Sequence, residues 1–78
     1  MNQENKKKVF FIEKEKFETT ADQLTVRQIL VDYGGYDPAK NILVLKKGLI
    51  ELKDLGQLID MENGMHFTVF NSEPNPVS

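Results

Sequence analysis

The stretch Leu24-Thr25-Val26-Arg27-Gln28-Ile29-Leu30 contains the clearest local signal in the chain. Thr25 can accept a hydrogen bond from the amide of Gln28, while the Gln28 side chain can reach back to the amide of Thr25. This reciprocal pair satisfies two backbone donors that a helix otherwise leaves open at its start. The stretch therefore predicts that a helix begins directly after Thr25.

The same helix has one apolar face. Leu24 and Ile29 have the spacing of a hydrophobic staple. Four residues share a face at helical spacing: Val26, Ile29, Leu30 and Tyr33. Gly34 is suited to end the helix in a left-handed conformation. We expect about three turns of helix whose apolar face covers a sheet.

Two segments upstream of the helix, 9–13 and 16–20, are rich in aromatic and β-branched residues. The polar pair 14–15 between them predicts a two-residue hairpin turn that pairs Ile12 with Phe17. The next pair would be Phe10 with Thr19, and the residues expected to point inward are Phe10, Ile12 and Phe17. Because neither Gly nor Asn occupies the turn, the register is open to a slip.

The segment downstream of the helix contains three more predicted strands, one of them short. The apolar run 41–46 forms a strand that Gly48 ends, and 49–61 reads as a wrapped connection with a short strand and a helical turn. The pair 63–64, Asn-Gly, is a tight-turn signal before a last strand at 65–70. That strand alternates between Met65, Phe67 and Val69 on one face and His66, Thr68 and Phe70 on the other.

Composition limits the possible functions. The chain has 78 residues, enough for one domain with a modest core, and a formal net charge of -2, without the basic excess of a nucleic-acid binder. The longest apolar run, 9–12, is too short for a membrane span or a signal-peptide core. We therefore expect a cytoplasmic monomer that contacts neither membranes nor nucleic acid.

Catalytic chemistry has few candidates in the sequence. The chain contains no cysteine and a single histidine, His66, so it offers neither a thiol nucleophile nor the ligands of a typical metal site. Its carboxylates fall in predicted turns and on exposed faces without a second polar partner. We expect no enzymatic activity, no metal and no bound cofactor.

The two ends of the chain differ in composition from the middle. Residues 1–8 are almost wholly polar and predict a disordered leader, and 9–70 form the folded domain. Residues 71–78, rich in Pro and small polar residues, predict a flexible tail. The alternative for the tail is an untethered end without a role.

The order of predicted elements is that of the ubiquitin-like β-grasp fold, and several segments resemble the bacterial multi-ubiquitin domain family. The resemblance covers about residues 8 to 70. It implies an α+β fold in which a mixed four- to five-stranded sheet packs on one helix. The segments that carry it are Val9-Phe10-Phe11-Ile12, Leu24-Thr25-Val26-Arg27-Gln28-Ile29-Leu30, Tyr36-Asp37-Pro38, Ile42-Leu43-Val44-Leu45 and Asp60-Met61-Glu62-Asn63-Gly64-Met65-His66-Phe67.

The resemblance implies a prokaryotic ubiquitin-like modifier. An adenylating activating enzyme would use ATP to activate its C-terminus, and the other implied partners are a conjugating-enzyme-like protein and a metal-dependent peptidase. The chain lacks the terminal diglycine of ubiquitin, and many family members carry several domains in tandem. A peptidase could trim the tail, the partners could accept a different end, or conjugation could be absent. The tail residues concerned are Asn71, Ser72, Glu73, Pro74, Asn75, Pro76, Val77 and Ser78.

The outer face of the sheet is the second candidate site. If Leu43 and Leu45 face the helix, the alternate residues of that strand face outward beside the last strand. The expected partner-binding set is Ile42, Val44, His66, Thr68 and Phe70. We expect an exposed Val44, so that Val44→Asp weakens binding at little cost in stability. The alternative is that a few exposed aliphatic residues have no role.

Two other functions share the fold. A non-conjugated ubiquitin-like interaction module would use the outer face alone. A sulfur carrier would need a terminal glycine, which the chain lacks.

Overall fold

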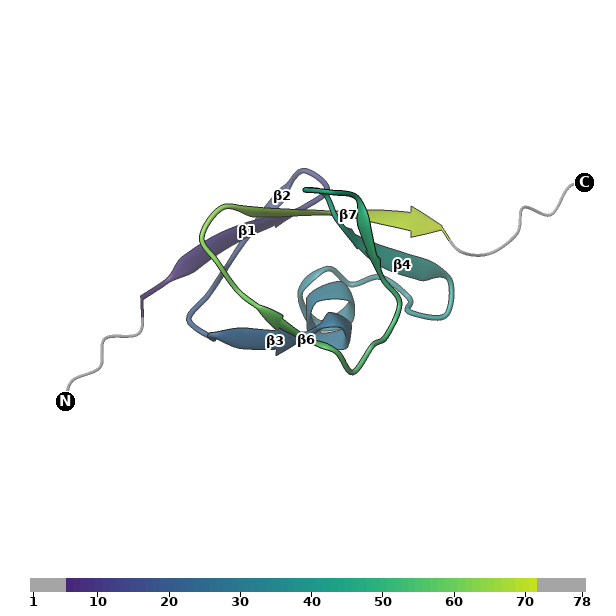
Figure 1. The fold of residues 1–78 in the computed structure, drawn as a ribbon, viewed down its shortest axis with the longest axis horizontal. Helices are drawn as coiled ribbons and strands as arrows, with labels where there is room; N and C mark the ends of the chain where they lie inside the picture. Colours follow the sequence, from purple (N-terminus) through teal and green to yellow (C-terminus); the bar gives the residue numbers. More distant parts are fainter. Residues whose placement is uncertain (1–5, 72–78) are drawn as a thin grey trace, which may run out of the picture.

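The computed structural model describes residues 6–71 as a mixed α+β structure. Its main sheet has five strands in the order β2-β1-β7-β4-β5, and only the central pair β1 and β7 is parallel (Figure 1). The α+β class and the mixed sheet of the sequence analysis are therefore confirmed. The five strands are β1 (Lys8–Ile12), β2 (Glu15–Thr19), β4 (Asn41–Leu45), β5 (Ile50–Leu52) and β7 (Met65–Asn71).

The helix begins where the sequence predicts. The Thr25 amide donates to Gln28 Oε1 at 2.8 Å, and the Gln28 amide donates to Thr25 Oγ1 at 3.1 Å. Helical structure starts at Val26 and continues as η1 (Gln28–Tyr33), which is a π-helix. The helical segment thus covers 26–33, shorter than the three turns expected.

The end of the helix differs from the prediction. The Gly34 amide donates to the Ile29 carbonyl at 3.0 Å, five residues back, and Gly34 itself has a right-handed φ of -78°. The left-handed residue is Gly35, with φ +76°. Gly34 is instead required by space, because a Cβ there would lie 2.8 Å from the Leu30 carbonyl oxygen.

The first hairpin has a different register from the predicted one. Phe10 pairs with Phe17, and Ile12 pairs with Glu15, so the turn is Glu13-Lys14 rather than 14–15. The predicted pairs of Ile12 with Phe17 and of Phe10 with Thr19 are wrong by two residues. Because side chains alternate with a period of two, the predicted inward faces survive the shift. The chosen register also stacks the Phe10 and Phe17 rings, with centroids 5.6 Å apart.

The wrapped connection contains strands rather than a helical turn. After β5 the chain forms β6 (Leu58–Asp60), which pairs antiparallel with β3 (Gln23–Thr25). This second, two-stranded sheet was not predicted. At one end of this sheet, the paired residues Gln23 and Asp60 are also joined by a 2.7 Å hydrogen bond from Gln23 Nε2 to Asp60 Oδ1.

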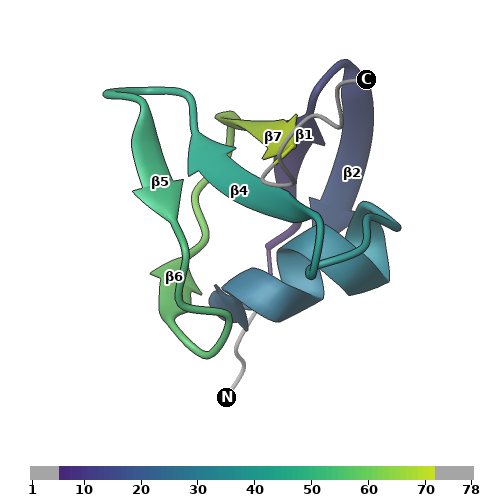
Figure 2. The same ribbon diagram turned by 90° about the vertical axis from the view of Figure 1, so that its right-hand side faces the viewer.

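The core lies between the main sheet and the helix (Figure 2). The Tyr33 ring packs against Phe10, and its hydroxyl donates to Thr19 Oγ1 at 3.1 Å. The core consists of Phe10, Ile12, Leu24, Val26, Ile29, Leu30, Leu43, Leu52, Met61 and Phe67. The predicted helix face and the inward set of the hairpin are therefore confirmed, with Phe17 only half-buried at the edge.

The boundaries of the folded part differ slightly from those expected. β1 begins at Lys8, the last residue of the predicted leader, and β7 ends at Asn71, the first residue of the predicted tail. The other tail residues, 72–78, and the first part of the leader, 1–5, lie outside the described residues.

Candidate functional site

The outer face of the main sheet brings the predicted binding residues together. Within β4, Leu43 belongs to the core, so its neighbours Ile42 and Val44 point to the opposite face. Across the ladder, Ile42 pairs with Phe70 and Val44 pairs with Thr68. Since paired residues share a face, the predicted adjacency of these residues on β4 and β7 is confirmed.

The predicted exposure of Val44 is wrong. Its side chain has 0% exposure although it lies outside the core cluster. Val44 lies in an inner strand, between Thr68 on β7 and Glu51 on β5. Because this side chain is fully covered, a carboxylate there would be cut off from water, and the expectation that Val44→Asp costs little stability no longer holds.

Phe70 and Ile42 form the open part of this face. Phe70 is 47% exposed, and its cross-strand partner Ile42 is half-buried. The pair lies at the end of β7, next to Asn71, which pairs with Asn41. An exposed aromatic ring beside a branched aliphatic chain is a suitable anchor for a protein partner.

His66 is held by an aromatic ring that the sequence analysis did not select. The rings of Phe11 and His66 stack with centroids 4.7 Å apart and an angle of 8° between their planes. Phe11 is half-buried, and the alternation of β1, which turns Phe10 and Ile12 inward, was the signal that could have found it. The outer face thus continues from β4 across β7 to β1.

Thr68 is occupied by an internal contact. Its hydroxyl donates to Glu13 Oε2 at 2.7 Å, and the same oxygen accepts the Val69 amide at 2.7 Å. These bonds, first Thr68 and then Val69, hold the pKa of Glu13 below its usual value against a small opposing effect of burial. Thr68 therefore supports the face and is not a free donor for a partner.

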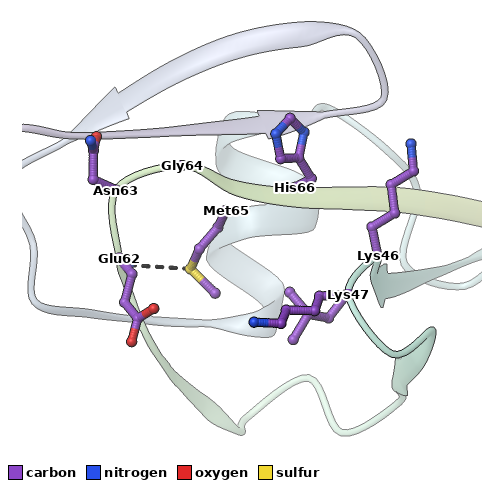
Figure 3. Close-up of a pocket in the computed structure, with 8 residues that line it drawn as sticks. Lys46, Lys47, Glu62, Asn63, Gly64, Met65 and His66 are labelled. Carbon is purple, nitrogen blue, oxygen red and sulfur yellow. Dashed lines mark hydrogen bonds between the residues drawn. The ribbon is translucent and has the colours of Figure 1, made fainter.

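An open hollow of about 620 Å³ lies at the start of β7. Its polar side chains do not converge: Lys46 and His66 project to one side of β7, and Lys47 lies on the other side with Met65 (Figure 3). The Glu62 amide donates to Met65 Sδ at 3.2 Å. Groups that point apart in this way do not define a ligand pocket.

No family model, curated protein or solved structure matches the chain. Within residues 6–71, no cluster of three or more His, Cys, Asp or Glu side chains could hold a metal ion. In the same part of the chain, no helix has the length and apolar character of a membrane span. Among residues 6–71, the outer face of the main sheet is the candidate site.

Proposed function

We propose that the chain is a ubiquitin-like protein modifier with the β-grasp fold. The observation that carries the proposal is the place of β7. It is the middle strand of the sheet, parallel to β1 and antiparallel to β4, so the chain leaves the domain at the end of a strand that pairs with β4 through Asn71. A modifier needs such an arrangement, because the residues that follow must enter a partner's active site while the domain stays folded.

The sequence resemblance to the bacterial multi-ubiquitin domain family supports the same proposal. It supplies the expected partners, an adenylating activating enzyme, a conjugating-enzyme-like protein and a metal-dependent peptidase. In this scheme the domain itself performs no chemistry. The outer face, with Ile42 and the exposed Phe70 next to the end of β7, docks the enzyme that acts on residues beyond Asn71.

The test is reaction with an activating enzyme encoded beside the gene. The full chain, the enzyme and ATP are incubated, and intact mass is measured for an adenylate or a covalent adduct. Either product supports the proposal. The absence of both contradicts it, provided that the same enzyme preparation consumes ATP with its own substrate.

A second candidate is a non-conjugated interaction module, favoured by the apolar outer face. The two functions separate on a deletion of 72–78, which keeps Asn71 and its pairing with Asn41. The deletion abolishes adduct formation by a modifier and leaves binding by a module unchanged. Phe70→Ala removes the exposed ring and keeps the tail, so it should weaken the binding of a partner by an interaction module.

A further inference from the structure

The two halves of β7 have different neighbours on the β1 side. β1 pairs with β7 only from Met65 to Phe67, because the chain turns away at Glu13. On the other side, β4 accompanies β7 from Phe67 to Asn71. The last part of β7 therefore has a strand on one side only, and this is the part that carries the chain out of the domain.

Glu13 takes the place of the missing strand. Its amide donates to the Phe67 carbonyl at 2.9 Å, as the next residue of a strand would. Its carboxylate oxygen Oε2 then accepts both the Val69 amide and the Thr68 hydroxyl at 2.7 Å. One residue thus makes three hydrogen bonds to three successive residues of β7, over a separation of 56 positions from Val69.

The backbone of Glu13 is held in an unusual conformation for this contact. Its φ is +59°, in the left-handed region that glutamate rarely occupies. Glycine or asparagine would occupy this turn position with less strain, but neither has a side chain that supplies a carboxylate. The strained residue thus lies at the point where its carboxylate reaches β7.

The charge of Glu13 suits its role. A carboxylate is a stronger acceptor than a neutral oxygen, and the 2.7 Å distances are those of charge-assisted bonds. The charged groups that act on it are Lys14 in its own turn and Lys46 after β4, both of which favour the ionised form. Among residues 6–71, none forms a salt bridge with Glu13.

We propose that Glu13 is the positioning residue for the exit of the chain: its carboxylate fixes the end of β7 and so the direction in which residues beyond Asn71 reach a partner. The functional half of this inference rests on the proposed modifier function. Glu13 touches no reacting atom and acts through Thr68 and Val69.

The first measurement is amide hydrogen exchange followed by NMR, which needs no partner. Glu13→Ala removes the acceptor, so the Val69 amide should exchange about tenfold faster or more. Glu13→Gln keeps a neutral acceptor and should give a smaller increase. The amides of Leu43 and Leu45 are the internal reference for global stability, and unchanged exchange at Val69 in Glu13→Ala overturns the proposal.

Two further variants separate positioning from a general loss of fold. Thr68→Val removes one donor and leaves the carboxylate, so it should raise the exchange rate of the Val69 amide less than Glu13→Ala does. Glu15→Ala is the matched control, since Glu15 is an exposed glutamate of the same hairpin without a side-chain bond to β7. If Glu15→Ala changes Val69 as much as Glu13→Ala does, the positioning role is wrong.

The second measurement is the rate of adduct formation with the activating enzyme and ATP. Glu13→Ala should lower kcat severalfold, because the direction in which the chain leaves β7 is no longer fixed. It should change KM less than twofold, because the docking face is intact. A wild-type kcat together with faster exchange at Val69 overturns the functional half. If the wild-type chain forms no adduct, the proposed function fails, and the exchange data alone decide the role of Glu13.

Discussion

Leu43 and Val44 are adjacent in β4 and equally inaccessible, yet they are buried in different ways. Both have 0% exposure, but only Leu43 belongs to the core cluster under the helix. Val44 lies on the opposite face of the sheet, where it pairs with Thr68 on β7 and Glu51 on β5. Strand alternation fixes the face on which a side chain lies, whereas its exposure depends on its neighbours.

The largest expected effect is on the Leu43 side of this comparison. Leu43→Ala leaves a cavity between the sheet and the helix, and we expect a loss of about 3 kcal/mol in the free energy of unfolding, measured in urea. Leu45→Ala is the control on the same face, where the residue is only half-buried, and it should cost less. Equal losses would show that the core does not distinguish the two positions.

The next largest loss of stability is expected for Val44→Asp. A carboxylate at a fully covered position is cut off from water, so we expect a loss of about 2 kcal/mol in the free energy of unfolding. Ile42→Asp, on the same face and half-buried, should cost less because its carboxylate can reach solvent. A loss below about 0.5 kcal/mol for Val44→Asp would mean that its neighbours move aside and the position behaves as exposed.

Glu13→Gln should have a smaller effect on stability, below about 1 kcal/mol at pH 7, because the carboxylate is exposed. The variant is distinguished by the pH dependence of its free energy of unfolding. The folded pKa lies below the ordinary value of 4.5, so the contribution of Glu13 is present above that value and is lost as pH falls through the folded pKa. Unfolding curves between pH 7 and 2 should show this loss in the wild type and not in Glu13→Gln.

Phe70→Ala should change stability least, by less than about 0.5 kcal/mol, because the ring is 47% exposed. It should nevertheless weaken binding to the activating enzyme by about 2 kcal/mol, measured by calorimetry. Leu58→Ala is the control, an exposed apolar residue in the other sheet. Equal weakening by both variants would contradict a specific role of the outer face.

Local signals in the sequence predicted the start of the helix and the faces of β4 and β7. The capping pair of Thr25 and Gln28 needs only residues within one turn, and strand alternation needs only residues within one strand. Asn63-Gly64 likewise forms the expected turn, with φ +90° at Gly64. Each of these features is determined by residues close in sequence, so local patterns are enough to predict it.

Features that depend on distant residues were missed. The hairpin turn at Glu13 is coupled to Thr68 and Val69, 55 and 56 positions away, and no local rule favours glutamate there. The pairing of β3 with β6 joins two three-residue strands, too short to show alternation. Alternation within β4 gives the face on which Val44 lies but not its full burial. In the candidate site, strand alternation therefore predicted the outward residues of β4 and β7, but neither Phe11 on β1 nor which of these residues are accessible.

The parallel pairing of β1 with β7 has a consequence for how the protein acquires its structure. The first strand of the chain has its sheet neighbours in the second strand and in the last, so the sheet stays divided until Met65–Asn71 have been synthesised and docked. Pairings this far apart in sequence slow folding, because a long loop must close before they form. We expect nascent chains that stop before Met65 to remain unfolded on the ribosome and to be sensitive to proteases. Chains released after Asn71 should fold in one cooperative step.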